Sequence, residues 1–145
     1  MSLGALHLLF APSRSINVVG ASRESILATV RQVLAAGLLR PDDLEMVVQD
    51  SLQGAPAAKA AWPLAASQED ISAQAAMICV PTLVISGEKD RVDPPAVLQK
   101  ELMTRIPHAT LHILPGIGHL SPLEASGEIS ELIRSFASRL LTAMH

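Results

Sequence analysis

The chain has 145 residues, a net charge of −3, 49% hydrophobic residues and only 17% charged residues. This length limits the chain to one ordinary domain at most, and the high apolar fraction excludes an intrinsically disordered protein. The acidic net charge and an aromatic content of 2% disfavour nucleic-acid binding, which needs basic surfaces and rings for base stacking.

The longest apolar stretches are too short to form a membrane span. Leu3–Pro12 and Ala75–Ile85 are both interrupted, whereas a transmembrane helix needs roughly 20 consecutive apolar residues. Leu3–Pro12 resembles the apolar part of a signal peptide, but no Lys or Arg precedes Arg14. We therefore expect a cytoplasmic protein without a membrane partner.

Helices dominate the expected structure of the first half, which is rich in Ala and Leu. Ser22 is expected to cap a helix that runs to Gly37, with apolar residues at helical spacing. Pro41 fits the first position of a second helix, and Gly54 is expected to end it. Shorter helices are expected over residues 57–61 and from Ser67.

Three polar or reactive residues before the first strand are interpreted as structural residues and not as parts of a functional site. Asp42 and Asp43 are interpreted as the solvated acidic start of the second helix, where negative charge is favourable. Cys79 is the single cysteine, so an internal disulfide is excluded, and its apolar neighbours predict a buried thiol.

Strand signals dominate the second half. The apolar run Thr82–Ser86 predicts a strand covered on both faces, and Thr110–Leu114 predicts a second strand. Between them, Asp93 is expected to cap a helix that reaches about Arg105. A helical stripe of apolar residues extends from Ile129 to Leu141. The order strand, helix, strand, helix predicts a βαβα unit with a parallel sheet.

Two polar loops follow the two expected strands. Glu88–Asp93 contains several acidic residues, and Gly116–His119 ends in a histidine. Because the carboxyl ends of parallel strands meet at one edge of a sheet, we expect an acid and the histidine to lie together there. A carboxylate that orients an imidazole is the acid–base part of a nucleophilic triad.

These segments resemble those of a known family. Pro81–Pro94 closely resembles the acid-bearing segment of α/β-hydrolases, and Ile106–His119 resembles the segment that carries their catalytic histidine. The specific resemblance extends over about residues 80–140. Residues 4–78 resemble, more weakly, the helical cap that such enzymes insert before their last two strands. The resemblance implies an α/β fold with a partial parallel sheet over 79–145, preceded by an all-helical cap-like segment over 4–78.

The resemblance also implies roles for the polar residues. Asp90 would orient His119, and His119 would act as general base. Asp93 is the alternative acid. Asp90 is preferred because it follows the strand at the family's distance and because Asp93 is expected to cap a helix. No cofactor is implied, and no metal site is expected.

The nucleophile of the family is missing from these 145 residues. It is usually a Ser in Gly-x-Ser-x-Gly. Ser22 follows Gly20 at the right spacing, but Glu24 stands where the second glycine belongs. We therefore expect a chain that corresponds to the carboxyl-terminal part of a hydrolase and is inactive by itself.

Two classes of function follow. In an intact enzyme the chain would help to hydrolyse an ester-like bond of a small, mainly hydrophobic substrate. Alternatively, it is a non-catalytic fragment or binding module, which associates with protein or binds coenzyme A or a nucleotide through Val18–Ser22. An exposed sheet edge predicts a homo-oligomer or pairing with a nucleophile-bearing half.

Overall fold

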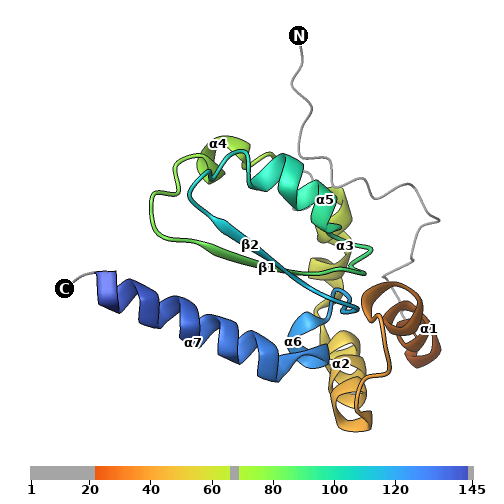
Figure 1. Ribbon diagram of the computed structural model, residues 1–145. Coiled ribbons are helices and arrows are strands. Elements are labelled where there is room, and N and C mark those ends of the chain that lie inside the picture. The colour runs from red at the N-terminus through yellow and green to blue at the C-terminus, as the bar shows by residue number, and fades with distance from the viewer. Residues whose placement is uncertain (1–21, 66–68, 144–145) are drawn as a thin grey trace.

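A computed structural model describes residues 22–65 and 69–143 of the chain (Figure 1). The elements in chain order are α1 (Arg23–Thr29), η1 (Val30–Leu34, π-helical), α2 (Pro41–Gln53), α3 (Pro56–Leu64), α4 (Ser72–Ala75), β1 (Leu83–Gly87), α5 (Pro95–Val97), η3 (Leu98–Leu102, π-helical), β2 (Thr110–Leu114), α6 (Ser121–Glu124) and α7 (Ser126–Ala143).

The sheet of the described residues consists of two parallel strands. β1 pairs with β2 in a register that places Leu83 opposite Thr110 and Gly87 opposite Leu114. α5 and η3 connect the two strands, and α6 and α7 follow β2 (Figure 1). This order confirms the expected βαβα unit behind a helical segment. Only the carboxyl end of β1 is fully buried, at Ser86 and Gly87, so the expected cover on both faces is confirmed only there.

The first two helices form a hairpin with the main apolar core. Ile26, Val30, Ala35 and Val48 are buried together, and Leu120 from the loop after β2 packs against them. The expected cap is confirmed, because the Ser22 Oγ accepts a hydrogen bond from the Ser25 amide at 3.2 Å. Contact with Leu120 brings this helical hairpin directly beside the loop that carries the candidate histidine.

The first helix ends earlier than predicted. Ala35 is already extended, with φ −96° and ψ 143°, so the helix stops at Leu34 instead of Gly37. Pro41 and Gly54 bound α2 as expected. Glu45 of α2 accepts a hydrogen bond at 3.0 Å from Arg23 of α1, and this pairing lowers the pKa of Glu45 to about 2.

Two polar residues lie in surroundings that the sequence did not predict. Asp43 is not solvated: it is buried, and both of its carboxylate oxygens accept hydrogen bonds from the Arg40 guanidinium, at 2.7 and 2.9 Å. This pairing lowers the pKa of Asp43. Asp93 does not cap the helix between the strands: Pro94 is the N-cap residue and Pro95 begins α5. The cap shifts because the turn before it is formed by Asp90, whose carboxylate binds the Asp93 amide at 2.9 Å.

The predicted buried thiol is also wrong. Cys79 is exposed, and Met77 and Val80 beside it are exposed as well, so the described residues place no apolar cover over this segment. Within the described ranges, no helix is both long and apolar enough to cross a membrane. The expected apolar element at the start of the chain, most of Val18–Ser22 and the cap at Ser67 lie outside the described residues.

Candidate active site

The loops after β1 and β2 are bonded to each other. The Glu88 amide donates to the Leu114 carbonyl at 2.9 Å, and the Lys89 amide donates to the Ile117 carbonyl at 2.8 Å. In return, the Gly116 amide donates to the Glu88 carboxylate at 2.8 Å. The parallel register therefore continues into the loops and fixes their relative position at the carboxyl edge of the sheet.

Asp90 and His119 meet at this edge, as the sequence predicts. The Nδ1 atom of His119 lies 3.0 Å from the Oδ2 atom of Asp90, although the residues are 29 positions apart. The Oδ1 atom of Asp90 accepts hydrogen bonds from the amides of Val92 and Asp93, at 2.8 and 2.9 Å. These two amides hold the carboxylate in one orientation, which leaves the other oxygen for the imidazole.

The burial of the pair differs between its members. The Asp90 side chain is 8% exposed, whereas the His119 side chain is 34% exposed. An ionised carboxylate only accepts hydrogen bonds, so the neutral imidazole donates from Nδ1 and keeps its lone pair on Nε2. Among the described residues, no hydrogen-bond partner contacts Nε2. This geometry leaves Nε2 available as a base.

Asp93 lies at the margin of the pair. Its Oδ2 atom is 4.0 Å from the His119 Nδ1 atom, which is beyond hydrogen-bond distance. Partial burial and the neighbouring Asp90 charge raise the pKa of Asp93, while His119 acts against this rise. The preference for Asp90 thus agrees with the distances, although the helix-capping reason for it does not hold.

Two serines that come into question as nucleophiles are engaged in structural contacts. Ser22 caps α1, and Ser86 is buried in β1 with its hydroxyl 3.4 Å from the Gly87 carbonyl. Neither is hydrogen-bonded to His119. Among the described residues, the His119 side chain makes one hydrogen bond, to Asp90, and no serine hydroxyl is bonded to it.

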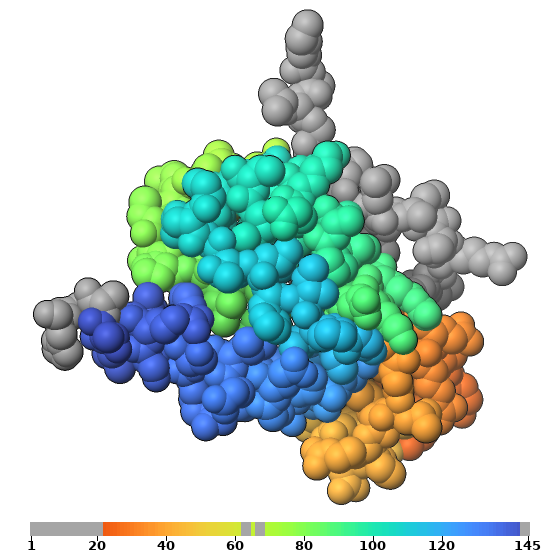
Figure 2. Space-filling model, in the orientation of Figure 1, coloured from red at the N-terminus to blue at the C-terminus, as the bar shows by residue number. Residues whose placement is uncertain are grey.

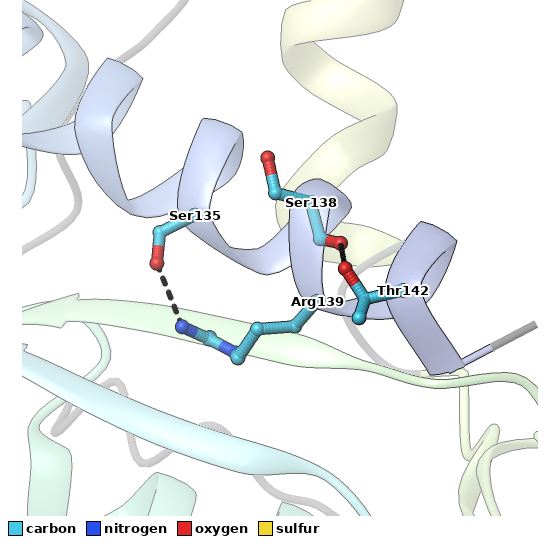
Figure 3. A pocket seen from close by; sticks show the side chains of 4 residues that line it. All are labelled: Ser135, Ser138, Arg139 and Thr142. Atoms are coloured by element: carbon cyan, nitrogen blue, oxygen red, sulfur yellow. Dashed lines mark hydrogen bonds between the residues drawn. The ribbon is translucent and has the colours of Figure 1, made fainter. Parts of the chain in front are cut away.

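A shallow hollow along α7 is a separate feature (Figure 3). It is lined by Ser135, Ser138, Arg139 and Thr142, all from this one helix. The Arg139 guanidinium donates to the Ser135 hydroxyl at 2.7 Å, and the Thr142 hydroxyl donates to the Ser138 carbonyl at 3.1 Å. These two hydrogen bonds run along the helix, and no residue of the candidate pair lines the hollow.

Glu124, which the sequence analysis did not single out, lies directly beneath the histidine loop. Its Oε1 atom accepts from the Gly118 amide at 3.1 Å, and its Oε2 atom accepts from the Ala36 amide at 2.8 Å and the Gly37 amide at 3.3 Å. Its position five residues after His119 at the end of a short helix carries no recognisable local signal.

The parallel βαβα unit and the acid–histidine pair at its carboxyl edge define the class of α/β-hydrolases. Residues 29–126, more than half of the chain, match the family "Serine aminopeptidase, S33". The chain therefore belongs to this family of α/β-hydrolases.

Proteins of several activities resemble the chain. A 58-residue stretch is 41% identical to "Epoxide hydrolase EphH" of Mycobacterium tuberculosis and covers 39% of this chain and 27% of that protein. The bromoperoxidase from Bacillus anthracis superposes with a TM-score of 0.74 at 19% identity, over 84% of this chain and 46% of that one. The esterase from Exiguobacterium antarcticum superposes with a TM-score of 0.71 at 20% identity, over 81% of this chain and 43% of the esterase.

These coverages show that the chain spans less than half the length of the relatives it matches. The low identities to the solved structures establish the shared fold alone. The reaction of the intact enzyme is therefore a matter for proposal.

Proposed function

We propose that this chain supplies the acid and the base of a hydrolase that cleaves an ester-like bond. The observation that carries this proposal is the 3.0 Å contact between His119 Nδ1 and the buried Asp90 carboxylate. In this role, Nε2 of His119 removes a proton from a nucleophilic hydroxyl and then returns it to the leaving group. The Asp90 carboxylate holds the imidazole in the required tautomer and stabilises the imidazolium that forms.

The proposal requires a nucleophile that lies outside the 145 residues of this chain. The 145 residues contain no Gly-x-Ser-x-Gly turn. Without a nucleophile and oxyanion donors, a base has nothing to activate, so we expect little or no turnover by the chain alone. The apolar composition of the helical segment supports a small, mainly hydrophobic substrate. A cytoplasmic location remains part of the proposal.

The tautomer of His119 provides a direct test on the chain itself. Two-bond ¹H–¹⁵N correlation spectra, recorded where the His119 imidazole is neutral, should show His119 protonated on Nδ1 and unprotonated on Nε2. Asp90→Ala should abolish this preference, while His108→Gln, at an exposed histidine, should leave the His119 signals unchanged. A wild-type His119 that carries its proton on Nε2 would contradict the proposed base.

A chimaeric enzyme tests the catalytic roles. Residues 29–143 replace the aligned part of the Exiguobacterium antarcticum esterase, and hydrolysis of p-nitrophenyl butyrate is measured. His119→Ala and Asp90→Ala should each lower kcat by about 10³-fold or more, because they remove the base or its orientation. Asp93→Ala serves as the matched control and should stay within about tenfold. An active chimaera that does not depend on His119 would refute the assignment.

A further inference from the structure

Three stretches of backbone pack against one another at the candidate site. They are the end of β1 at Gly87, the histidine loop at Ile117–Gly118, and the segment Leu34–Gly37 that follows the first helix. A Cβ atom on Gly87 would lie 2.3 Å from the Gly118 carbonyl oxygen and 2.4 Å from that of Ile117. A Cβ atom on Gly118 would lie 2.6 Å from the Ala36 nitrogen. The histidine loop is therefore held between two other backbones, without space for a side chain.

The segment 34–37 binds the main chain of the catalytic histidine. The His119 amide donates to the Leu34 carbonyl at 2.7 Å, and the Leu120 amide donates to the same oxygen at 3.3 Å. In the space-filling view of Figure 2, the helical hairpin of α1 and α2, in orange, lies against the part of the chain that follows β2, in blue. The position of His119 thus depends on where segment 34–37 lies.

One carboxylate joins these two backbones. Glu124 accepts one amide from the histidine loop, at Gly118, and two from the opposite segment, at Ala36 and Gly37. Gly118 is buried and Ala36 is half-buried, so their amides have little access to water. Hydrogen bonds to a charged acceptor are stronger than neutral ones, and a buried amide without an acceptor is costly.

The loop after β1, which carries Asp90, is bonded to the histidine loop and to the first helix. The Lys89 amide binds the Ile117 carbonyl, and the Arg91 guanidinium donates to the Gln32 carbonyl at the end of the first helix. Both loops of the candidate pair therefore contact the first helix or the segment 34–37 that follows it. The Glu124 side chain is bonded both to that segment and to the histidine loop.

We propose that Glu124 is a positioning residue for the Asp90–His119 pair: its carboxylate fixes segment 34–37 against the histidine loop and so keeps the imidazole in contact with Asp90. This inference rests on the proposed function of the pair. Glu124 does not reach the reacting atoms and acts only through the backbone amides that it binds.

The test uses the 145-residue chain and compares Glu124→Ala with Glu128→Ala. Glu128 is an exposed acid in the first turn of α7 and serves as the matched control. Glu124→Ala should reduce the hydrogen-exchange protection of the Ala36, Gly37 and Gly118 amides by about 10- to 100-fold. It should also turn the single Nδ1–H tautomer of His119 into a mixture, while Glu128→Ala changes neither readout.

Conservative variants separate positioning from general stabilisation. Glu124→Asp should not rescue the tautomer, because the shorter side chain cannot reach both backbones. Glu124→Gln should rescue it partly, because its carbonyl oxygen can accept on one side while its NH₂ group opposes an amide N–H on the other. If Glu124→Ala does not fold, the tautomer and the amide protection are measured on the isosteric Gln variant, where a partial loss of both is expected.

The outcomes distinguish the two proposals. Retention of the wild-type His119 tautomer and amide protection in the Ala or Gln variant would overturn the positioning role, even if the melting temperature fell. A wild-type His119 that lacks the Nδ1–H tautomer would instead refute the proposed function, before any Glu124 variant is considered.

Discussion

At the residue scale, the candidate site is governed by how the two oxygens of one carboxylate are used. Asp90 commits Oδ1 to the Val92 and Asp93 amides and leaves Oδ2 for His119. No described residue donates a hydrogen bond to the Asp93 carboxylate, and its Oδ2 atom is 4.0 Å from Nδ1 of the imidazole. The difference between the two acids is therefore one of orientation by the backbone, which residue type alone does not reveal.

The raised pKa of Asp93 predicts a pH-dependent effect on stability. A carboxyl group whose pKa is higher in the folded protein favours folding fully below its unfolded pKa, near 3.8, and loses this contribution as pH rises through its folded pKa. Asp93→Asn should therefore be more stable than the wild type at neutral pH, and the two should converge near pH 3. Urea denaturation across this range measures the difference. A variant that is less stable at pH 7 would contradict the prediction.

At the element scale, close backbone contacts rather than large side chains position the loops. Gly87 and Gly118 occur where one backbone approaches another, and neither has space for a Cβ atom. The helical hairpin of α1 and α2 contributes through the Leu34 carbonyl, which accepts the His119 amide, and through the Ala36 and Gly37 amides, which donate to the Glu124 carboxylate. The helical segment is thus bonded directly to the site, while its predicted boundary at residues 78 and 79 stays a prediction.

Two glycine substitutions should have opposite effects. Gly87→Ala places a methyl group against backbone oxygens of the histidine loop, so we expect a loss of about 1–3 kcal/mol or more in unfolding free energy. Gly127→Ala, in the first turn of α7, meets nothing within 4 Å and should stabilise the protein by up to about 1 kcal/mol. Chemical denaturation of both variants checks the signs. Equal effects would show that the contact at Gly87 is not restrictive.

At the scale of the whole molecule, the sheet has an unpaired edge. Within the described residues β1 pairs only with β2. The Thr82 carbonyl and the Glu88 amide both bond towards β2, so the alternation of a strand directs the backbone groups of Leu83 and Ile85 to the opposite edge. Such an edge is a template for another strand.

We propose that the chain associates through this edge, either with a second copy or with a nucleophile-bearing half. Light scattering after size exclusion should show a species larger than a monomer. Ile85→Pro, which removes an outward amide, should give a monomer with the sheet retained. Val84→Pro, the matched control, removes an amide directed at β2 and should disrupt the fold. A wild-type chain that stays monomeric at high concentration would contradict association with a second copy.

The sequence alone determined the strands, the start of α2 and the meeting of Asp90 with His119, because apolar runs, proline positions and the common edge of parallel strands are local or topological signals. It also indicated the hydrolase family, which the comparison with known proteins confirmed. Only the tertiary structure decided which backbone groups hold Asp90, that Asp43 is buried against Arg40, and that Glu124 reaches Ala36 across 88 positions. These contacts depend on how separate elements pack, and no periodicity along the chain records that packing.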